Sequence, residues 1–315
     1  MLFFPSKTHD RLNGQPFAPE LITGTVMVNP HHRGVTVADG TREVMIDSGA
    51  FQERDMLRRR TPDEALARQV AMALRLGQGM VTPPRFIAVT YDMLVGVDEA
   101  IIEGKRVKRR GTEQTAALAV EETIRSAAYY AANRPLGIAI AFSAQGATVP
   151  QYLRCAAELL DLMRPGDLFA FGGFCIIGMQ PRLKPQFVET VRRVLPMLRR
   201  KGIHRAHILG VCVHDALIAV AALGSRHDVQ LSTDSSSIEM NSIHGRVWDE
   251  AHMRAGRSPW RQVFGKEHKK SDGPVSYHPC RLAIENIERF SRWSASLEML
   301  TAPHPKPAAQ IEMFG

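Results

Sequence analysis

The chain has 315 residues, of which 44% are hydrophobic and 23% charged, a composition that excludes a fibrous or disordered protein. Its formal charge of +8 favours polyanionic partners such as nucleic acid, although charge alone does not require one. Apolar, β-branched runs then alternate with segments of helical periodicity. The predicted strands are 44–47, 85–92, 136–146, 167–174, 205–212 and 228–237. The predicted helices are 60–77, 113–133, 149–163, 184–202, 215–224 and 280–299.

This alternation implies a parallel sheet with right-handed crossovers, which closes either as a doubly wound open sheet or as a barrel. The barrel is preferred because it takes its active-site residues from the C-terminal ends of many strands, where the unusual residues of this chain fall. No GxGxxG follows the first predicted strand, which weakens a dinucleotide-binding alternative. We predict an α/β fold with a single (β/α)8 barrel of the TIM type over 1–300, an irregular insertion at about 238–279, and an extended tail at 301–315.

The cysteines and the hydropathy pattern indicate the compartment. The four cysteines are widely spaced and form no CxxC pair, which argues against a disulfide framework and indicates reduced thiols. No stretch approaches the roughly 20 apolar residues of a membrane span. We therefore expect a cytoplasmic protein without a membrane partner.

Three acids lie at or just after predicted strand ends, namely Asp47, Asp92 and Asp234. A single such acid is usually a helix cap or a loop ligand. Three carboxylates at one barrel mouth repel one another, however, and that cost makes a purely structural role for all of them less expected. Paired carboxylates suit glycosidic chemistry, in which one attacks the anomeric carbon and the other transfers protons.

Other strand ends carry Gln145, Gly172 and Gly173. A glutamine amide offers donors and an acceptor that match a purine edge, but it can equally serve a loop hydrogen bond. The paired glycines either let a flat ligand approach the backbone or are needed for a positive φ. A metal-dependent hydrolase of this fold would carry an HxH motif at the end of the first strand, and this motif is absent. His207 and His214 are interpreted as structural.

Six segments, in order, resemble the tRNA-guanine transglycosylase family. DSGAFQ (47–52) is similar to the family's DSGGFQ, VTYD (89–92) to its base-binding strand, and AFSAQGA (141–147) to its VQGG motif. AFGGFCIIG (170–178) resembles GGLAVGE, and HILGVCVHDALIAVAALG (207–224) resembles LMGVGTPEDLLEAVARG. DVQLSTDSSS (228–237) then stands where the family has its nucleophile strand. The resemblance covers roughly 40–240 and implies a (β/α)8 enzyme that exchanges guanine for a 7-deazaguanine.

The resemblance implies a role for each matching residue. Asp234 would be the nucleophile and Asp47 the general acid/base. The remaining implied residues of the base-binding pocket are Ser48, Asp92, Gln145, Gly172, Gly173 and Phe174.

The departures from the family pattern point to a branch. Ala50 stands where the family usually has glycine, and SSSIEMN replaces an arginine-bearing stretch. The zinc subdomain of the tRNA enzymes is absent or degenerate, because only SYHPCRLAIENIERF (276–290) is similar to it. No cofactor is expected, and a structural zinc is the less favoured alternative, its available ligands being His278, Cys280 and His268.

These departures are more similar to the deazapurine-DNA transglycosylase branch, which inserts 7-cyano-7-deazaguanine into DNA. DNA and a 7-deazaguanine base are therefore the expected partners, with a possible accessory protein that opens the duplex. Two alternatives stay open: a queuine tRNA-ribosyltransferase-like enzyme acting on tRNA, and a non-catalytic barrel that binds a nucleobase or nucleic acid.

Among several basic clusters, KRVKRR (105–110) is the preferred contact for the nucleic-acid backbone, since it is predicted to lie in the loop before a long helix, at the same rim as the acids. A run of charges is otherwise usually a solvated face. The predicted contacts are Lys105, Arg106, Lys108, Arg109 and Arg110.

Overall fold

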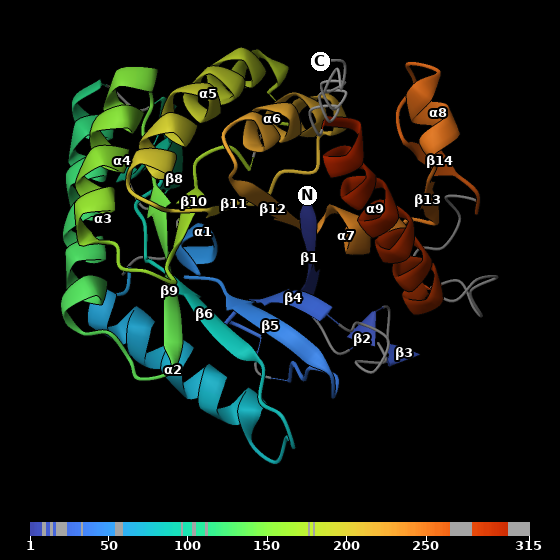
Figure 1. The fold of residues 1–315 in the computed structure, drawn as a ribbon, viewed down its shortest axis with the longest axis horizontal. Coiled ribbons are helices and arrows are strands. Elements are labelled where there is room, and N and C mark those ends of the chain that lie inside the picture. The colour runs from blue at the N-terminus through green and yellow to red at the C-terminus, as the bar shows by residue number, and fades with distance from the viewer. Residues whose placement is uncertain are drawn as a thin grey trace, which may run out of the picture.

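The aliphatic and β-branched runs pair edge to edge into a closed barrel of eight parallel strands in the computed structural model (Figure 1). Around the barrel the order is β1-β12-β11-β10-β9-β6-β5-β4. The barrel strands are β1 (Leu2–Lys7), β4 (Gly24–Val28), β5 (Thr41–Ile46), β6 (Arg85–Val89), β9 (Ile138–Ala144), β10 (Leu168–Phe171), β11 (Arg205–Ile208) and β12 (Gln230–Ser235). The structure describes residues 1–7, 11–12, 15–16, 24–32, 34–53, 59–95, 97–102, 105–110, 113–175, 177–178, 180–264 and 279–301.

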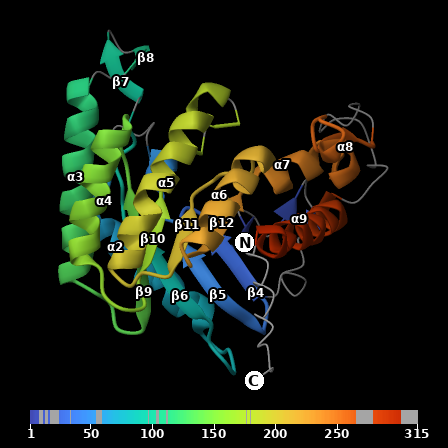
Figure 2. The same ribbon diagram turned by 45° about the horizontal axis from the view of Figure 1, so that its top comes forward.

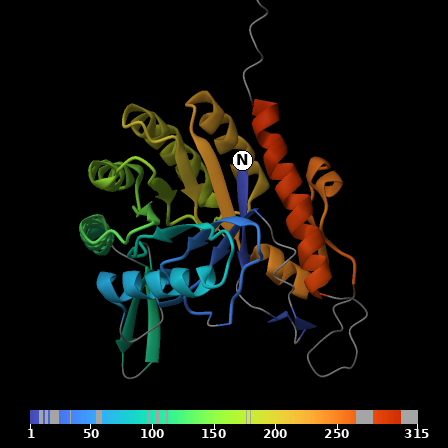
Figure 3. The same cartoon turned by 60° about the horizontal axis from the view of Figure 1, so that its bottom comes forward.

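Six long helices lie outside the strands, and Figure 3 shows them ranged around the barrel. They are α2 (Pro62–Gly77), α3 (Glu113–Ala132), α4 (Val149–Leu162), α5 (Lys184–Arg200), α6 (His214–Arg226) and α9 (Pro279–Thr301). Each agrees with a predicted helix to within a few residues. The prediction of an α/β fold with a (β/α)8 barrel is confirmed.

Two barrel strands, β1 and β4, were not predicted. β1 carries Pro5 and Lys7 within six residues, so it lacks the uninterrupted apolar run of a buried strand. β1 nevertheless pairs with β12 on one side and with β4 on the other, and so closes the barrel. The described residues between β1 and β4 and between β4 and β5 contain no helix. These connections therefore lack the helical periodicity of apolar residues by which a β–α unit is recognised in a sequence.

Side chains alternate between the two faces of the barrel wall. Along β4, Met27 points into the barrel, whereas Val26 and Val28 pack outward against the helices. The inner cluster is Phe4, Met27, Met45, Ile87, Val89, Ala141, Leu168 and Ala170. The interior is therefore a packed core, and space for a ligand remains only at an end of the barrel.

An ion-pair network crosses the N-terminal end of the barrel. Glu43 on β5 accepts hydrogen bonds from Arg85 on β6, at 3.1 Å, and from Arg205 on β11, at 2.6 and 2.8 Å. The two arginines hold the pKa of this half-buried carboxyl below its usual value, against the opposing effect of burial. These contacts link strands on different sides of the barrel and fill its floor, which leaves the C-terminal end as the place for a site.

The segment predicted as an irregular insertion is more regular than expected. Through residue 264 it contains α7 (Ser237–Ile243), α8 (Glu250–Arg254) and a hairpin of β13 (Arg246–Trp248) with β14 (Trp260–Gln262). Elements of three to seven residues are too short to show an apolar period, which is why the sequence did not reveal them. Residues 265–278 and the predicted tail from 302 onward lie outside the described residues.

The basic segment 105–110 does not form the predicted loop. It is strand β8 (Lys105–Arg110), paired antiparallel with β7 (Val97–Ile102). A run of basic residues lacks the alternation that marks a strand, so the prediction of a loop was wrong. Figure 2 shows the hairpin standing above the N-terminal end of α3, on the side where β6 delivers its last residues. The side chains of the five predicted backbone contacts lie outside what the structure describes.

Four shorter elements remain among the described residues. They are the hairpin of β2 (Arg11–Leu12) and β3 (Gln15–Pro16), the four-residue helix α1 (Ala50–Glu53), and the 3-10 turn η2 (Pro181–Leu183). Of these, α1 matters for the site, because it begins three residues after Asp47.

Candidate active site

A cavity of about 360 Å³ opens at the C-terminal ends of the barrel strands. Its volume is within the range of roughly 300–1,000 Å³ that is usual for small-molecule sites. The predicted site residues that line it are Asp47, Ser48, Asp92, Gln145, Gly172, Gly173 and Asp234. Phe174 was also predicted there but does not line the cavity, because its buried ring packs against Tyr152 and Phe187 at centroid distances of 5.6 and 5.0 Å. Residues from five segments that are distant in sequence thus meet at one mouth.

Asp47 follows β5, and its backbone N–H donates to the carbonyl of Val28 at 2.8 Å. Asn29 Nδ2 donates to Asp47 Oδ2, and the N–H of Ser48 donates to Oδ1, each at 2.8 Å. Burial raises the pKa of the Asp47 carboxyl to about 7, and the nearby carboxylates Asp234 and Asp92 contribute in the same direction. The side chain is thus held in a fixed orientation and can change its protonation state near neutral pH.

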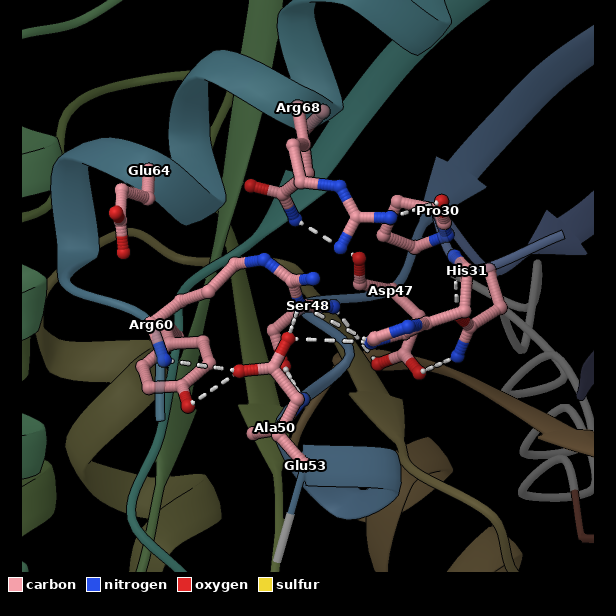
Figure 4. Close-up of polar contacts among 12 residues, drawn as sticks. Pro30, His31, Asp47, Ser48, Ala50, Glu53, Arg60, Glu64 and Arg68 are labelled. Carbon is pink, nitrogen blue, oxygen red and sulfur yellow. Dashed lines mark hydrogen bonds and ion pairs between the residues drawn. The ribbon is translucent and has the colours of Figure 1, made fainter. Parts of the chain in front are cut away.

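A buried glutamate anchors the loop that carries Asp47, as Figure 4 shows. Glu53 on α1 is fully buried, forms an ion pair with Arg60, and accepts a hydrogen bond from the Tyr91 hydroxyl at 2.9 Å. His31 Nε2 lies 3.1 Å from Glu53 Oε1. The cluster ties α1 to the residues preceding α2 and to the end of β6. The turn between Asp47 and α1 therefore has little freedom to move.

Gly49 is the turn position where a side chain would not fit. Its φ is +80°, and a Cβ atom there would lie 2.8 Å from His31 Nε2. Ala50, by contrast, begins α1 and is buried without strain. The alanine that departs from the family's DSGGFQ pattern is therefore compatible with the fold of this loop.

Asp92, after β6, is held by polar side chains of β9 and of the residue that follows it. Ser143 Oγ donates to Asp92 Oδ2 at 2.9 Å, and Gln145 Nε2 donates to the same oxygen. Burial raises the pKa of Asp92 in spite of these hydrogen bonds. Gln145 Oε1 is buried and has no hydrogen-bond partner among the described residues, so it is an acceptor left over at the cavity wall.

The paired glycines allow the loop after β10 to approach Gln145. A Cβ atom at Gly172 would lie 2.7 Å from Ser143 Oγ and would overlap the Gln145 amide. Gly173 has a φ of +81°, and a Cβ there would lie 2.7 Å from Gln145 Oε1. Of the two glycines, Gly173 has the positive φ that the sequence left open, and the close neighbour of both is the side chain of Gln145, a part of the site itself.

Asp234 lies in β12 and is surrounded by hydrogen-bond donors. The N–H of Gly210 donates to Oδ1 at 2.8 Å, and His207 Nε2 lies 3.0 Å from the same oxygen. Ser6 Oγ donates to Oδ2 at 3.2 Å. Donors of this kind stabilise a negative charge on the carboxylate and fix its orientation. Oδ1 is held by two groups and Oδ2 by one, so Oδ2 is the freer oxygen.

His207 was interpreted as structural from the sequence, and its contacts give it a second role. It is fully buried inside the barrel, with its Nδ1 2.9 Å from Ser232 Oγ and its ring edge-on to Phe4. Because a carboxylate only accepts hydrogen bonds, Nε2 must carry the proton that it shares with Asp234. His207 therefore orients Asp234 from inside the barrel.

Replacing His207 by leucine should reduce the rate of any reaction in which Asp234 takes part about 10- to 100-fold, with little change in KM. A hydrogen bond to a charged group contributes roughly 1.5–3 kcal/mol, which corresponds to that range. His207→Gln keeps an amide donor and should recover part of the rate. Single-turnover kinetics measure the effect, with thermal unfolding as the control for folding. Equal losses in both variants would mean that packing, and not the donated hydrogen bond, is what the histidine supplies.

The residues of the proposed zinc alternative are not placed by the structure. His268 and His278 lie outside the described residues, and the side chain of Cys280 in α9 does so as well. Within the described ranges, no group of three or more His, Cys, Asp or Glu side chains is arranged to hold a metal ion.

Comparison with known proteins does not assign the chain to a family: no protein-family model matches it, and no curated protein does either. None of the described helices combines the length and apolar character that a membrane crossing requires. Fold and site together define a (β/α)8 barrel whose C-terminal mouth holds a small cavity with three carboxylates. The function is therefore argued from this geometry.

Proposed function

We propose that the protein is a base-exchanging glycosyltransferase that replaces guanine in DNA by a 7-deazaguanine, 7-cyano-7-deazaguanine in the branch it is most similar to. The observation that carries the proposal is the sharing of one cavity by three carboxylates in unlike environments. Asp234 is held by donors, whereas burial keeps the pKa of Asp47 near 7. Two acids whose environments differ in this way are suited to the separate roles of nucleophile and proton carrier.

The first half of the proposed reaction forms a covalent intermediate. Asp234 Oδ2 attacks C1′ of the target deoxyguanosine, and the new O–C1′ bond forms as the C1′–N9 bond breaks. Guanine leaves with the bonding electron pair and takes a proton from Asp47. Oδ1, which keeps its hydrogen bonds from Gly210 and His207, becomes the carbonyl oxygen of the ester.

The second half reverses these bonds with a different base. The incoming 7-deazaguanine gives its N9 proton to the Asp47 carboxylate, and N9 attacks C1′. The ester bond breaks, and its electron pair returns to Asp234 as a carboxylate. Atoms and charges balance over the two halves, so the proposed cycle requires no redox cofactor.

Asp92 and Gln145 are the proposed readers of the base. Guanine presents both an acceptor, O6, and a donor, its N2 amino group. The unpaired Gln145 Oε1 supplies an acceptor, and the remaining oxygen of Asp92 can accept or, when protonated, donate. The glycine backbone at 172–173 borders the same space. These groups match a purine edge better than they match an apolar ligand.

The proposed substrate polymer is DNA, and the target base must leave the helical stack to reach the cavity. An accessory protein that opens the duplex fits this requirement. We propose a cytoplasmic location, in keeping with the cysteines Cys155, Cys175 and Cys212, which are all free thiols.

A base-exchange assay tests the function. The protein is incubated with radiolabelled guanine and, separately, with single-stranded DNA, duplex DNA and unmodified tRNA, and the label in each polymer is counted. We expect label in DNA, and more in single strands than in duplex. Label in tRNA alone would move the activity to RNA. The absence of label and of any denaturation-resistant adduct in all three polymers would overturn the proposal.

A further inference from the structure

A second cavity, of about 450 Å³, adjoins the active-site cavity. Cys175, Gly210 and Ser237 line both of them, so the two spaces meet along the loops after β10, β11 and β12. The proposed chemistry uses the first cavity only. A strand of nucleic acid that places one base in the first cavity continues on both sides of that base, and the shared residues offer one path to the second cavity.

The lining of the second cavity includes one tryptophan. Trp260 on β14 lines it, half-buried, and its indole packs at the edge of the main hydrophobic core. Pro259 and Ile177 add apolar surface, whereas Asn241 and His214 add polar groups. An aromatic face with a few polar groups around it is the usual receptor for an unstacked nucleobase.

The hairpin holds Trp260 in place. β14 pairs with β13 in a register that sets Trp260 opposite Trp248, which is 2% exposed and anchored in the core. On the polar side, Arg246 donates to Asn241 Oδ1 at 3.2 Å, and Asn241 Nδ2 donates to the carbonyl of Ser237 at 2.8 Å. The wall of the second cavity is therefore tied to the shared residue Ser237.

We propose that the second cavity receives the base of the nucleotide next to the target, and that this base stacks on Trp260. The inference rests on the proposed function, since it takes the first cavity to hold a base flipped out of a DNA strand. It adds a second subsite and a residue that recognises the strand beside the reaction centre. Stacking is tolerant of base identity, so the subsite would hold the strand without strict sequence preference.

Tryptophan fluorescence offers a direct test. The chain has three tryptophans, and the other two, Trp248 and Trp293, are 2% and 4% exposed. Binding of a single-stranded oligonucleotide should quench the protein's emission, and Trp260→Phe should remove most of that quenching. Trp260→Leu should weaken binding roughly tenfold, in line with the loss of one stacked base. Tyr129→Leu, at an exposed aromatic position on α3 outside both cavities, should leave binding unchanged.

A substrate series needs no variant and covers the case in which Trp260→Leu fails to fold. Oligonucleotides carrying an abasic site 5′ or 3′ to the target guanine are compared with the intact strand for binding and for base exchange. One of the two positions should lose binding about as much as Trp260→Leu does, and the double perturbation should add little. Normal exchange and binding with both abasic strands would overturn the subsite and leave the proposed function intact. Failure of the intact strand both to bind and to exchange would overturn the two together.

Discussion

Replacing Asp234 by asparagine is expected to abolish the covalent protein–DNA adduct and to lower base exchange by at least about a thousandfold. An amide is a far weaker nucleophile than a carboxylate, and the proposed cycle has no second group placed to attack C1′. The substitution keeps the shape of the site. The amide oxygen can accept from Gly210 and His207 as Oδ1 does, and the amide nitrogen can donate to Ser6 Oγ. Affinity for a strand containing the target guanine should therefore change little.

The adduct is measured by trapping wild-type protein with DNA, denaturing the mixture and separating protein bound to DNA from free protein. Asp228→Asn is a matched control, because Asp228 is an exposed aspartate just before the same strand and its backbone, with a φ of 53°, suits asparagine. It should form the adduct at the wild-type rate. An adduct that persists in Asp234→Asn would assign the nucleophile to another residue. A receptor without catalysis would bind DNA in both proteins and show an adduct in neither.

The three acids of the site were predictable because all strands of a parallel sheet point in the same direction. Asp47, Asp92 and Asp234 each follow or end a recognisable apolar strand, and the carboxyl ends of parallel strands share one rim. Gln145 was found for the same reason. Sequence spacing was therefore sufficient to place together residues that are almost 190 positions apart.

The groups that hold these acids were not predictable in the same way. Ser6 and Asn29 belong to β1 and to the residue after β4, the two strands that the sequence did not reveal. His207 lies in a predicted strand, but whether it faced inward depended on the register against β12, which sets His207 beside Ser232 and Ile208 beside Thr233. Glu53 lies in a helix of four residues, too short to show a period. The sequence thus predicts the reacting groups, whereas their supports depend on tertiary pairing.

Replacing Asp47 by asparagine should remove the pH dependence that its raised pKa gives to the reaction. In the wild type, guanine release needs protonated Asp47 and should slow as the pH rises through about 7. Resolution of the adduct by the incoming base needs the carboxylate and should accelerate over the same range. Asp47→Asn should slow both half-reactions roughly 100- to 10,000-fold and flatten both profiles. Single-turnover measurements from pH 5.5 to about 8.5 would separate the two, and parallel profiles for both half-reactions would contradict the shared-proton role.

The same pKa makes an independent prediction about stability. Because the folded-state pKa of Asp47 lies near 7 and its ordinary value is 3.8, the native state binds more protons than the unfolded state between these two values. The contribution of Asp47 to the free energy of unfolding must therefore fall as the pH rises through this window, and remain lowered above it. Asparagine has no proton to lose, so Asp47→Asn should gain stability relative to wild type from pH 4 to about 7, by on the order of 2 kcal/mol once water in the cavity is allowed for. Denaturant unfolding at several pH values measures the difference. If the difference in the free energy of unfolding between the two proteins does not change with pH, the pKa of Asp47 lies at its ordinary value, and the basis for its role as proton carrier is removed. If Asp47→Asn gains stability over this pH range and loses activity, both effects are assigned to the same carboxyl group.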